Sequence, residues 1–345
     1  MSERLSLLPM PHMNKLLTDI VPARRWDGVS DFFAWQTAAR ARLAEFLCLA
    51  EIEPCRTTPD LAIEYDRYAE DLGCREIRFR FFSEEAVSVP CHLLIPKDAA
   101  GPLPVVICLQ GHGPGMHISI GRPKNPYEAP LIDEGDRDFA RRAVREGICA
   151  LAMEQRCFGE SGGASDNPPC RQAPMRALLL GRTMIGERVW DVMRAIDVLE
   201  KSFTDVVDTD RILCLGNSGG GTATVYASAI DERIKISVPS CAVCAYADSI
   251  GSRLHCECNF IPGIAKEFDM GDICALVAPR TLIVVNGAED KSFPLAGAVA
   301  CVEEAKRCYV GAGRPDGVAH VIGNGGHRFY ADDTWGLIHA AIAQL

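Results

Sequence analysis

Apolar and polar positions follow two different periods in the first hundred residues. Between Ser30 and Leu49 the apolar residues recur at intervals of three and four, which predicts an amphipathic helix capped by Ser30 or Asp31. The segments 75–82 and 87–96 are rich in β-branched and aromatic residues and are separated by a short polar turn, which predicts an antiparallel pair of strands. We therefore expect residues 1–74 to form an N-terminal helical arm, followed by a larger domain at 75–345.

From Pro104 onward, short apolar runs alternate with helical stretches as far as the last residues. The predicted strands are 104–110, 148–154, 211–217, 234–240, 280–287 and 318–323, and the predicted helices lie near 134–146, 182–202, from about 219, near 295–308 and near 332–344. Nearly continuous apolar strands that alternate with helices are typical of a parallel sheet covered on both faces. The pattern predicts an α/β fold with a mostly parallel central sheet and a cap-like insertion at about 242–270.

Composition narrows the classes of partner. The chain has 345 residues and a formal net charge of -10 with no long basic run, which disfavours nucleic acid and anionic membrane surfaces as partners. No apolar run of membrane-spanning length occurs, and the first residues lack the pattern of a secretory signal, so we expect a cytoplasmic protein. The 16 cysteines are scattered through predicted strands and helices, which favours reduced, buried thiols over disulfides.

A serine enclosed by glycines ends the predicted strand 211–217. Residues 216–220 read GNSGG and fit the pattern G-x-S-x-G, in which a tight strand-to-helix turn presents the serine hydroxyl and the glycines avoid Cβ clashes. A phosphate-binding loop is disfavoured, because the lysine and the glycine spacing of such loops are missing. The motif favours Ser218 as a nucleophile and leaves a simple packing turn open.

A serine nucleophile needs a base and an acid, and both have candidates at the ends of later strands. Asp290 follows the strand 280–287, with Glu289 as a competing acid. His327 lies on a glycine-flanked loop after the strand 318–323, whereas His320 lies inside an apolar run and reads as a core residue. The chain order Ser, Asp, His is the one that this strand-turn-helix arrangement uses.

The same mechanism needs two N–H donors for a developing oxyanion. One candidate is the backbone N–H of Gly219, directly after the serine. The other is the backbone N–H of His112, in the loop that follows the strand 104–110. The glycines around His112 are also compatible with an ordinary tight turn.

These blocks together resemble the α/β-hydrolase superfamily, and within it the acetyl xylan esterase-like and dienelactone hydrolase-like serine esterases. The matching segments are QGHG, MEQRCFGESGG, GRTMIGERVWDVMRAIDVL, GNSGGG, VAPRTLIVVNGAED and NGGH. Glu154, Cys157 and Gln110 depart from the pattern of those esterases, and Ser218 stands where dienelactone hydrolases carry cysteine. The resemblance implies an α/β-hydrolase fold and a carboxylic ester hydrolase.

We therefore expect Ser218, His327 and Asp290 to hydrolyse a small-molecule ester through an acyl-enzyme, without a cofactor. Short acetyl esters of a polar or carbohydrate alcohol are the expected substrates, and whether the chain forms a homo-oligomer is left open. One alternative is a prolyl oligopeptidase-like peptidase, although the residues before 104 are too few for the propeller of those enzymes. Another alternative is a catalytically silent binding protein.

Two further groups of residues have both a chemical and a structural interpretation. Zinc-type ligands lie at Cys241, Cys244, His255, Cys256 and Cys258, but the spacing H-C-x-C is unusual for zinc, and we expect packing cysteines without a metal. Four arginines could attract an acidic substrate, although a solvated helix face with ion pairs to Glu187 and Asp191 is favoured: Arg171, Arg176, Arg182 and Arg188. The segments 159–175 and 246–269 are expected to cover the site.

Overall fold

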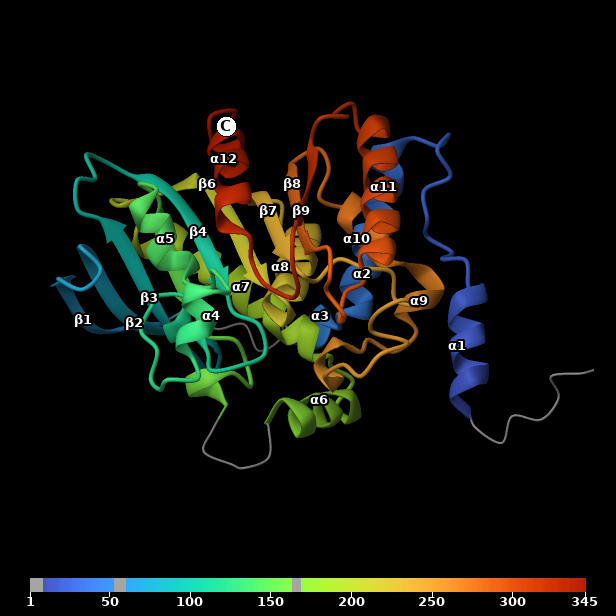
Figure 1. Cartoon of the computed structure of the whole chain (residues 1–345), viewed down its shortest axis with the longest axis horizontal. Coiled ribbons are helices and arrows are strands. Elements are labelled where there is room, and N and C mark those ends of the chain that lie inside the picture. Colours follow the sequence, from blue (N-terminus) through green and yellow to red (C-terminus); the bar gives the residue numbers. More distant parts are fainter. Residues whose placement is uncertain (1–8, 53–59, 163–168) are drawn as a thin grey trace, which may run out of the picture.

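The computed structural model describes residues 9–52, 60–162 and 169–345. In this part of the chain, nine strands form one sheet in the order β1-β2-β3-β5-β4-β6-β7-β8-β9 (Figure 1). The strands are β1 (Leu61–Ala69), β2 (Cys74–Glu84), β3 (Val87–Pro96), β4 (Leu103–Leu109), β5 (Cys149–Met153), β6 (Val207–Asn217), β7 (Ile234–Ser240), β8 (Thr281–Gly287) and β9 (Val318–Gly323).

Strand direction divides the sheet into two parts. β1, β2, β3 and β5 pair in antiparallel fashion, whereas β5, β4, β6, β7, β8 and β9 run parallel to one another. The expected mostly parallel sheet and the antiparallel pair β2–β3 are confirmed. β1 was not expected, so the prediction that residues 1–74 form a helical arm is wrong for residues 61–69; the domain boundary at residue 74 stays a prediction.

Helices cover both faces of the sheet, and the side chains of β4 show why. Val105, Ile107 and Leu109 belong to one apolar core, while Val106 and Cys108 belong to the other, because successive side chains of a strand point to opposite faces. The first core contains residues of α2 (Phe32–Phe46), α7 (Met184–Ser202), α8 (Gly219–Ile230), α10 (Met270–Ala275) and α11 (Leu295–Gly311). The second contains residues of α5 (Phe139–Arg145) and α12 (Ala331–Ile342).

Five further helices complete the described part of the chain. They are α1 (Pro9–Asp19), α3 (Leu49–Ile52), α4 (Ala129–Asp133), α6 (Pro169–Leu179) and α9 (Ile264–Glu267), with short 3₁₀ turns at η2 (Met116–Ile118), η3 (Gly159–Ser161) and η4 (Glu257–Asn259). Asp31 caps α2 as one of the two expected residues, since its carboxylate accepts the backbone N–H of Ala34. α6 was not predicted, and residues 163–168 of the expected covering segment lie outside the described residues.

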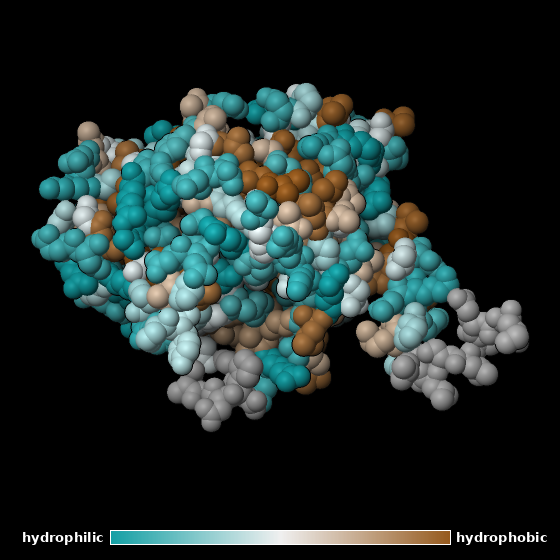
Figure 2. Space-filling model, viewed as in Figure 1, coloured by the Kyte–Doolittle hydropathy of each residue, from teal (hydrophilic) through white to brown (hydrophobic). Residues whose placement is uncertain are grey.

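The outer surface is mixed in polarity. Figure 2 shows hydrophilic side chains over most of one face, with apolar groups in smaller areas among them. Within the described ranges, no helix combines the length and the apolar character needed to cross a membrane. The features that distinguish the chain chemically lie at the carboxyl ends of the parallel strands, where ligands bind in open α/β sheets.

Candidate active site

Ser218 occupies the turn from β6 into α8. Its backbone has φ 57° and ψ -123°, a conformation that costs a non-glycine residue about 1–3 kcal/mol and persists only where neighbouring groups fix it. The Ser218 N–H donates to the carbonyl of Ser240 over 2.8 Å, which ties the turn to the end of β7. The strained turn that the G-x-S-x-G pattern predicts is therefore present.

The glycines beside Ser218 are required by packing. A Cβ on Gly216 would overlap the carbonyl of Gly220, and a Cβ on Gly220 would overlap the carbonyl of Leu109 in β4. The packing interpretation of these glycines is thus correct for Gly216 and Gly220. It does not account for the strain at Ser218 itself.

Asp290 and His327 form a hydrogen-bonded pair at the same edge of the sheet. His327 Nδ1 lies 2.7 Å from Asp290 Oδ2, and Asp290 Oδ1 accepts the backbone N–H groups of Ser292 (2.8 Å) and Phe293 (3.1 Å). Burial opposes ionisation of this carboxyl, but the His327 hydrogen bond and the two backbone donors outweigh burial and lower the pKa of Asp290 below its usual range. The Phe293 ring stacks on the imidazole with 5.9 Å between ring centroids, which helps to fix the orientation of the ring.

The competing candidates lie elsewhere. Glu289 is exposed, whereas its neighbour Asp290 is buried. His320, on β9, uses Nε2 to contact Asn286 Oδ1 at 3.1 Å. The structure thus brings together Asp290 and His327 and leaves Glu289 and His320 out of the pair.

The loop after β4 lies directly against the serine turn. A Cβ on Gly111 would lie 2.9 Å from the Ser218 Cβ, and a Cβ on Gly219 would lie 2.8 Å from His112 Nδ1. Among the described residues, no acceptor is hydrogen-bonded to the backbone N–H of Gly219 or of His112. The residues that carry the two expected oxyanion donors therefore lie next to Ser218, and their backbone N–H groups have no acceptor among the described residues.

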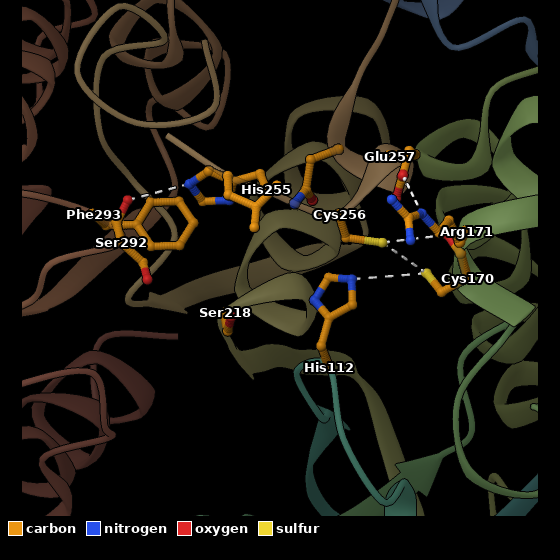
Figure 3. A pocket seen from close by; sticks show the side chains of 11 residues that line it. His112, Cys170, Arg171, Ser218, His255, Cys256, Glu257, Ser292 and Phe293 are labelled. Carbon is orange, nitrogen blue, oxygen red and sulfur yellow. Dashed lines mark hydrogen bonds and ion pairs between the residues drawn. The ribbon is translucent and has the colours of Figure 1, made fainter. Parts of the chain in front are cut away.

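A cavity of about 460 Å³ opens beside Ser218. Figure 3 shows His255 and Phe293 on one side of Ser218, and His112, Cys170 and Cys256 on the other. The lining is mostly apolar, and polar side chains are interspersed in it: the Arg171 guanidinium pairs with Glu257 at 3.1 Å, and His255 Nε2 lies 3.1 Å from Ser249 Oγ. Both segments that were expected to cover the site, 159–175 and 246–269, contribute residues to its wall. No sequence pattern indicated Phe293 as a lining residue, and His255 was indicated only as a zinc-type ligand.

The apolar residues of the insertion do not line this cavity as a group. Of its apolar residues Leu254, Phe260, Ile261, Pro262 and Ile264, only Leu254 borders the cavity. Phe260, Ile261 and Ile264 instead line a second cavity together with apolar residues of α1, Leu16 among them. Most of the apolar surface of the insertion therefore faces the cavity beside α1 and not the cavity beside Ser218.

Glu154, one of the three departures from the esterase pattern, is held in a buried turn. Its buried carboxylate accepts the backbone N–H groups of Met116 (3.2 Å) and Glu160 (3.1 Å), and so joins the turn after β5 to η2. Gly115 and Gly159 lie so close to this carboxylate that a Cβ on either would clash with it. Burial raises the pKa of Glu154 to about 7. Glu154 has a structural position, and it is not part of the Ser218 site.

One histidine and three cysteines gather beside the cavity, and we call them the thiol–imidazole cluster: His112, Cys170, Cys256 and Cys258. His112 Nε2 lies 3.1 Å from Cys258 Sγ and 3.7 Å from Cys170 Sγ, and the Cys256 and Cys170 sulfurs are 3.2 Å apart. All four ligand atoms lie within 4.8 Å of one another. Sequence spacing could not reveal this group, because its members come from three distant segments.

The other sulfur ligands suggested by the sequence lie apart from this cluster. Cys241 Sγ donates to the carbonyl of Arg328, and Cys244 Sγ donates to that of Pro294. Cys241 does lie near Asp290 and His327, a second group with ligand-like geometry. Because His327 Nδ1 lies 2.7 Å from the Asp290 carboxylate, we assign that group to the Asp290–His327 pair and not to a metal site.

Arg188 departs from the solvated helix face expected for the arginines. Its side chain is 1% exposed, and its guanidinium donates to the sulfurs of Cys258 and Cys170, each at 3.3 Å. Arg182 behaves as expected, pairing with Glu187 at 3.2 Å. The expectation is therefore wrong for Arg188.

Comparison with known proteins identifies the family. The profile of the Abhydrolase family matches residues 12–308, which is most of the chain. The chain belongs to this family. The predicted α/β-hydrolase fold and the resemblance to serine hydrolases of the acetyl xylan esterase and dienelactone hydrolase type are thereby confirmed.

Individual relatives agree with this assignment. A Bacillus subtilis protein named as a hydrolase, YtaP, is 28% identical over 245 residues, which are 69% of this chain and 77% of YtaP. A Bacteroides fragilis protein named as an acetyl xylan esterase superimposes with a TM-score of 0.76 and 19% identity, over 93% of this chain and 84% of its own. A glucuronoyl esterase from Solibacter usitatus gives a TM-score of 0.69 and 18% identity, over 95% and 99%. At these identities the two solved structures establish the fold alone.

Proposed function

We propose that this α/β-hydrolase is a serine esterase that cleaves short acyl esters, acetyl esters above all, of a polar or carbohydrate alcohol. The observation that carries the proposal is the strained backbone of Ser218 beside a cavity that Phe293 also lines. Phe293 stacks on the imidazole of the Asp290–His327 pair, which supports placing the nucleophile, the base and the acid in one site.

Each residue then has a definite part in the reaction. Ser218 Oγ attacks the ester carbonyl while His327 Nε2 accepts its proton, and Asp290 stabilises the imidazolium through Nδ1. The N–H groups of Gly219 and His112 stabilise the oxyanion of the tetrahedral intermediate. His327 returns the proton to the departing alcohol, and a water molecule, activated in the same way, releases the acyl group from Ser218.

The surroundings of Ser218 support a small polar substrate. A cavity of about 460 Å³ falls in the range of small-molecule sites, and the Arg171–Glu257 pair at its rim offers both donors and acceptors to hydroxyl groups. Two structural neighbours carry the names acetyl xylan esterase and glucuronoyl esterase. Three apolar residues of the insertion, Phe260, Ile261 and Ile264, line a separate cavity beside α1 and not the cavity beside Ser218.

The proposal is tested by kcat/KM for a series of p-nitrophenyl esters from acetyl to dodecanoyl, with Ser218→Ala as the control. We expect the highest value at acetyl, a steep fall with chain length, and no turnover above background in the control. A maximum at octanoyl or longer would contradict the short-acyl preference, and full activity of Ser218→Ala would contradict the mechanism.

A further inference from the structure

We propose that the thiol–imidazole cluster binds one zinc ion at the side of the cavity. The four side chains come from the loop after β4, the start of α6 and the segment around η4, and Figure 3 shows three of them, His112, Cys170 and Cys256, directed toward a common point. The proposal concerns a site separate from the Ser218 reaction, and metal binding there does not depend on the proposed esterase function.

The geometry is close to that of a tetrahedral site. Zinc bonds of about 2.3 Å to sulfur and about 2.0 Å to nitrogen place neighbouring ligand atoms about 3.5–3.8 Å apart. The separations in the cluster include 3.1, 3.2 and 3.7 Å, and none exceeds 4.8 Å. Small side-chain rotations therefore bring all four atoms to bonding distance. Three cysteines and one histidine are a set that structural zinc sites use.

The buried charge of Arg188 is the second, independent observation. Its guanidinium is always protonated and is removed from water, which is costly without a negative partner. Among the described residues, no carboxylate lies within ion-pair distance of Arg188, and the groups facing it are the sulfurs of Cys258 and Cys170, the Arg156 carbonyl and the Phe158 ring. Zn²⁺ with three thiolates and a neutral imidazole carries one net negative charge, which matches the charge of Arg188.

Other states of the cluster fit these contacts less well. Neutral packing thiols would leave the Arg188 charge uncompensated. A disulfide between Cys170 and Cys256 is within reach at 3.2 Å, but it would convert one partner of Arg188 into a neutral group and leave Cys258 as the remaining thiol. In the sequence, the unusual spacing H-C-x-C argued against zinc. The structure removes this objection, because Cys256 and Cys258 supply only half of the ligands and His112 and Cys170 supply the other half.

Zinc at this position would join three separate parts of the active-site wall. With Nε2 of His112 bound to the metal, Nδ1 must carry the ring hydrogen, on the side of the ring that faces Gly219. The metal would also fix the backbone of the same loop, which contributes the His112 oxyanion donor. This last consequence rests on the proposed function, whereas zinc binding itself does not.

The first test measures metal in the full chain. Protein produced in zinc-supplemented medium and purified under reducing conditions without chelators is expected to contain about one zinc ion per chain. After chelator treatment, Co²⁺ is expected to bind with the sulfur-to-metal charge-transfer bands and the intense visible absorption of a tetrahedral thiolate site. Returning Zn²⁺ to the chelator-treated protein is expected to raise its Tm by several degrees, because a ligand that binds only the folded state stabilises it.

Variants then locate the site. Cys258→Ser and Cys170→Ser are each expected to lose bound zinc and to weaken the cobalt charge-transfer bands. Cys244→Ser is the matched control, because Cys244 is a buried thiol of the same insertion whose sulfur contacts the Pro294 carbonyl, and it is expected to keep zinc. If a variant fails to fold, judged by circular dichroism, the cobalt spectrum of the unaltered chain still decides whether sulfur ligands hold the metal.

Three results would overturn the proposal. They are a chain without zinc and without a thiolate–cobalt spectrum, zinc that stays bound in both Cys258→Ser and Cys170→Ser, and protein purified in parallel without reductant in which Cys170 and Cys256 are joined by a disulfide. Esterase activity enters none of these readouts. A failed zinc site and a failed esterase are therefore distinguishable.

Discussion

Replacing Asp290 by asparagine removes one negative charge from the catalytic pair while keeping its size. In the native chain the carboxylate accepts from His327 Nδ1 at 2.7 Å and from two backbone N–H groups. An asparagine can turn its NH₂ group toward Nδ1, which forces the imidazole hydrogen onto Nε2. His327 would then have no lone pair with which to accept the Ser218 proton.

The size of the loss follows from the charge that His327 acquires during the reaction. With charge centres about 4 Å apart and an effective dielectric constant of about 20, the attraction between imidazolium and carboxylate is about 4 kcal/mol. At 1.36 kcal/mol per factor of ten, its loss lowers kcat by about 10³-fold. The assay is kcat and KM for p-nitrophenyl acetate across pH, with little change expected in KM.

The matched control is Glu289→Gln, which removes the same charge from the neighbouring exposed residue. We expect this variant to keep kcat within a few-fold of the unaltered chain. If Asp290→Asn retains near-normal kcat while Glu289→Gln loses activity, the acid has been misassigned and the argument from the 2.7 Å contact is refuted.

Two further predictions concern the residues around the site. Gly219→Ala places a methyl group 2.8 Å from the His112 ring and is expected to lower kcat by about 10–100-fold. Gly336→Ala, which has open space around it, is the control and is expected to leave kcat unchanged. Equal activity of both variants would count against the oxyanion assignment. The fold raises the pKa of Glu154 from an ordinary 4.5 to about 7. The protonated Glu154 carboxyl therefore stabilises the folded state fully below about pH 4.5, and this stabilisation is lost as pH rises through about 7. In urea unfolding, the free energy of unfolding should therefore fall by about 2 kcal/mol between about pH 5 and pH 8, and this fall should be absent in Glu154→Gln. Identical pH profiles of the two proteins would disprove the assignment.

The parts of the fold that the sequence revealed are those with a local physical signature. Buried parallel strands need apolar side chains on both faces, so β4, β6 and β8 stand out as continuous apolar runs. β1 has mostly exposed side chains and several charges, and no pattern marks it as a strand until β2 is beside it.

The same distinction applies to the site. Ser218, Asp290 and His327 each follow a recognisable strand, so the meeting of parallel strand ends at one edge of the sheet predicts that they lie together. The structure shows the contact between Asp290 and His327. The thiol–imidazole cluster depends on the folding of α6 and the insertion over the loop after β4, which no local pattern encodes. The prediction that Arg188 lies on a solvated helix face was wrong for the same reason. A charged residue on a helix is expected to be exposed to water unless another element covers it, and Arg188 is buried.

Covalent labelling tests the central claim most directly. A fluorophosphonate that mimics the acyl transition state is incubated with the full chain, and the product is analysed by intact mass and peptide mapping. The account predicts one phosphonyl group per chain on Ser218, no labelling of Ser218→Ala, and much slower labelling of Asp290→Asn. Labelling at a different residue, or an unlabelled Ser218 in protein that hydrolyses p-nitrophenyl acetate, would contradict it.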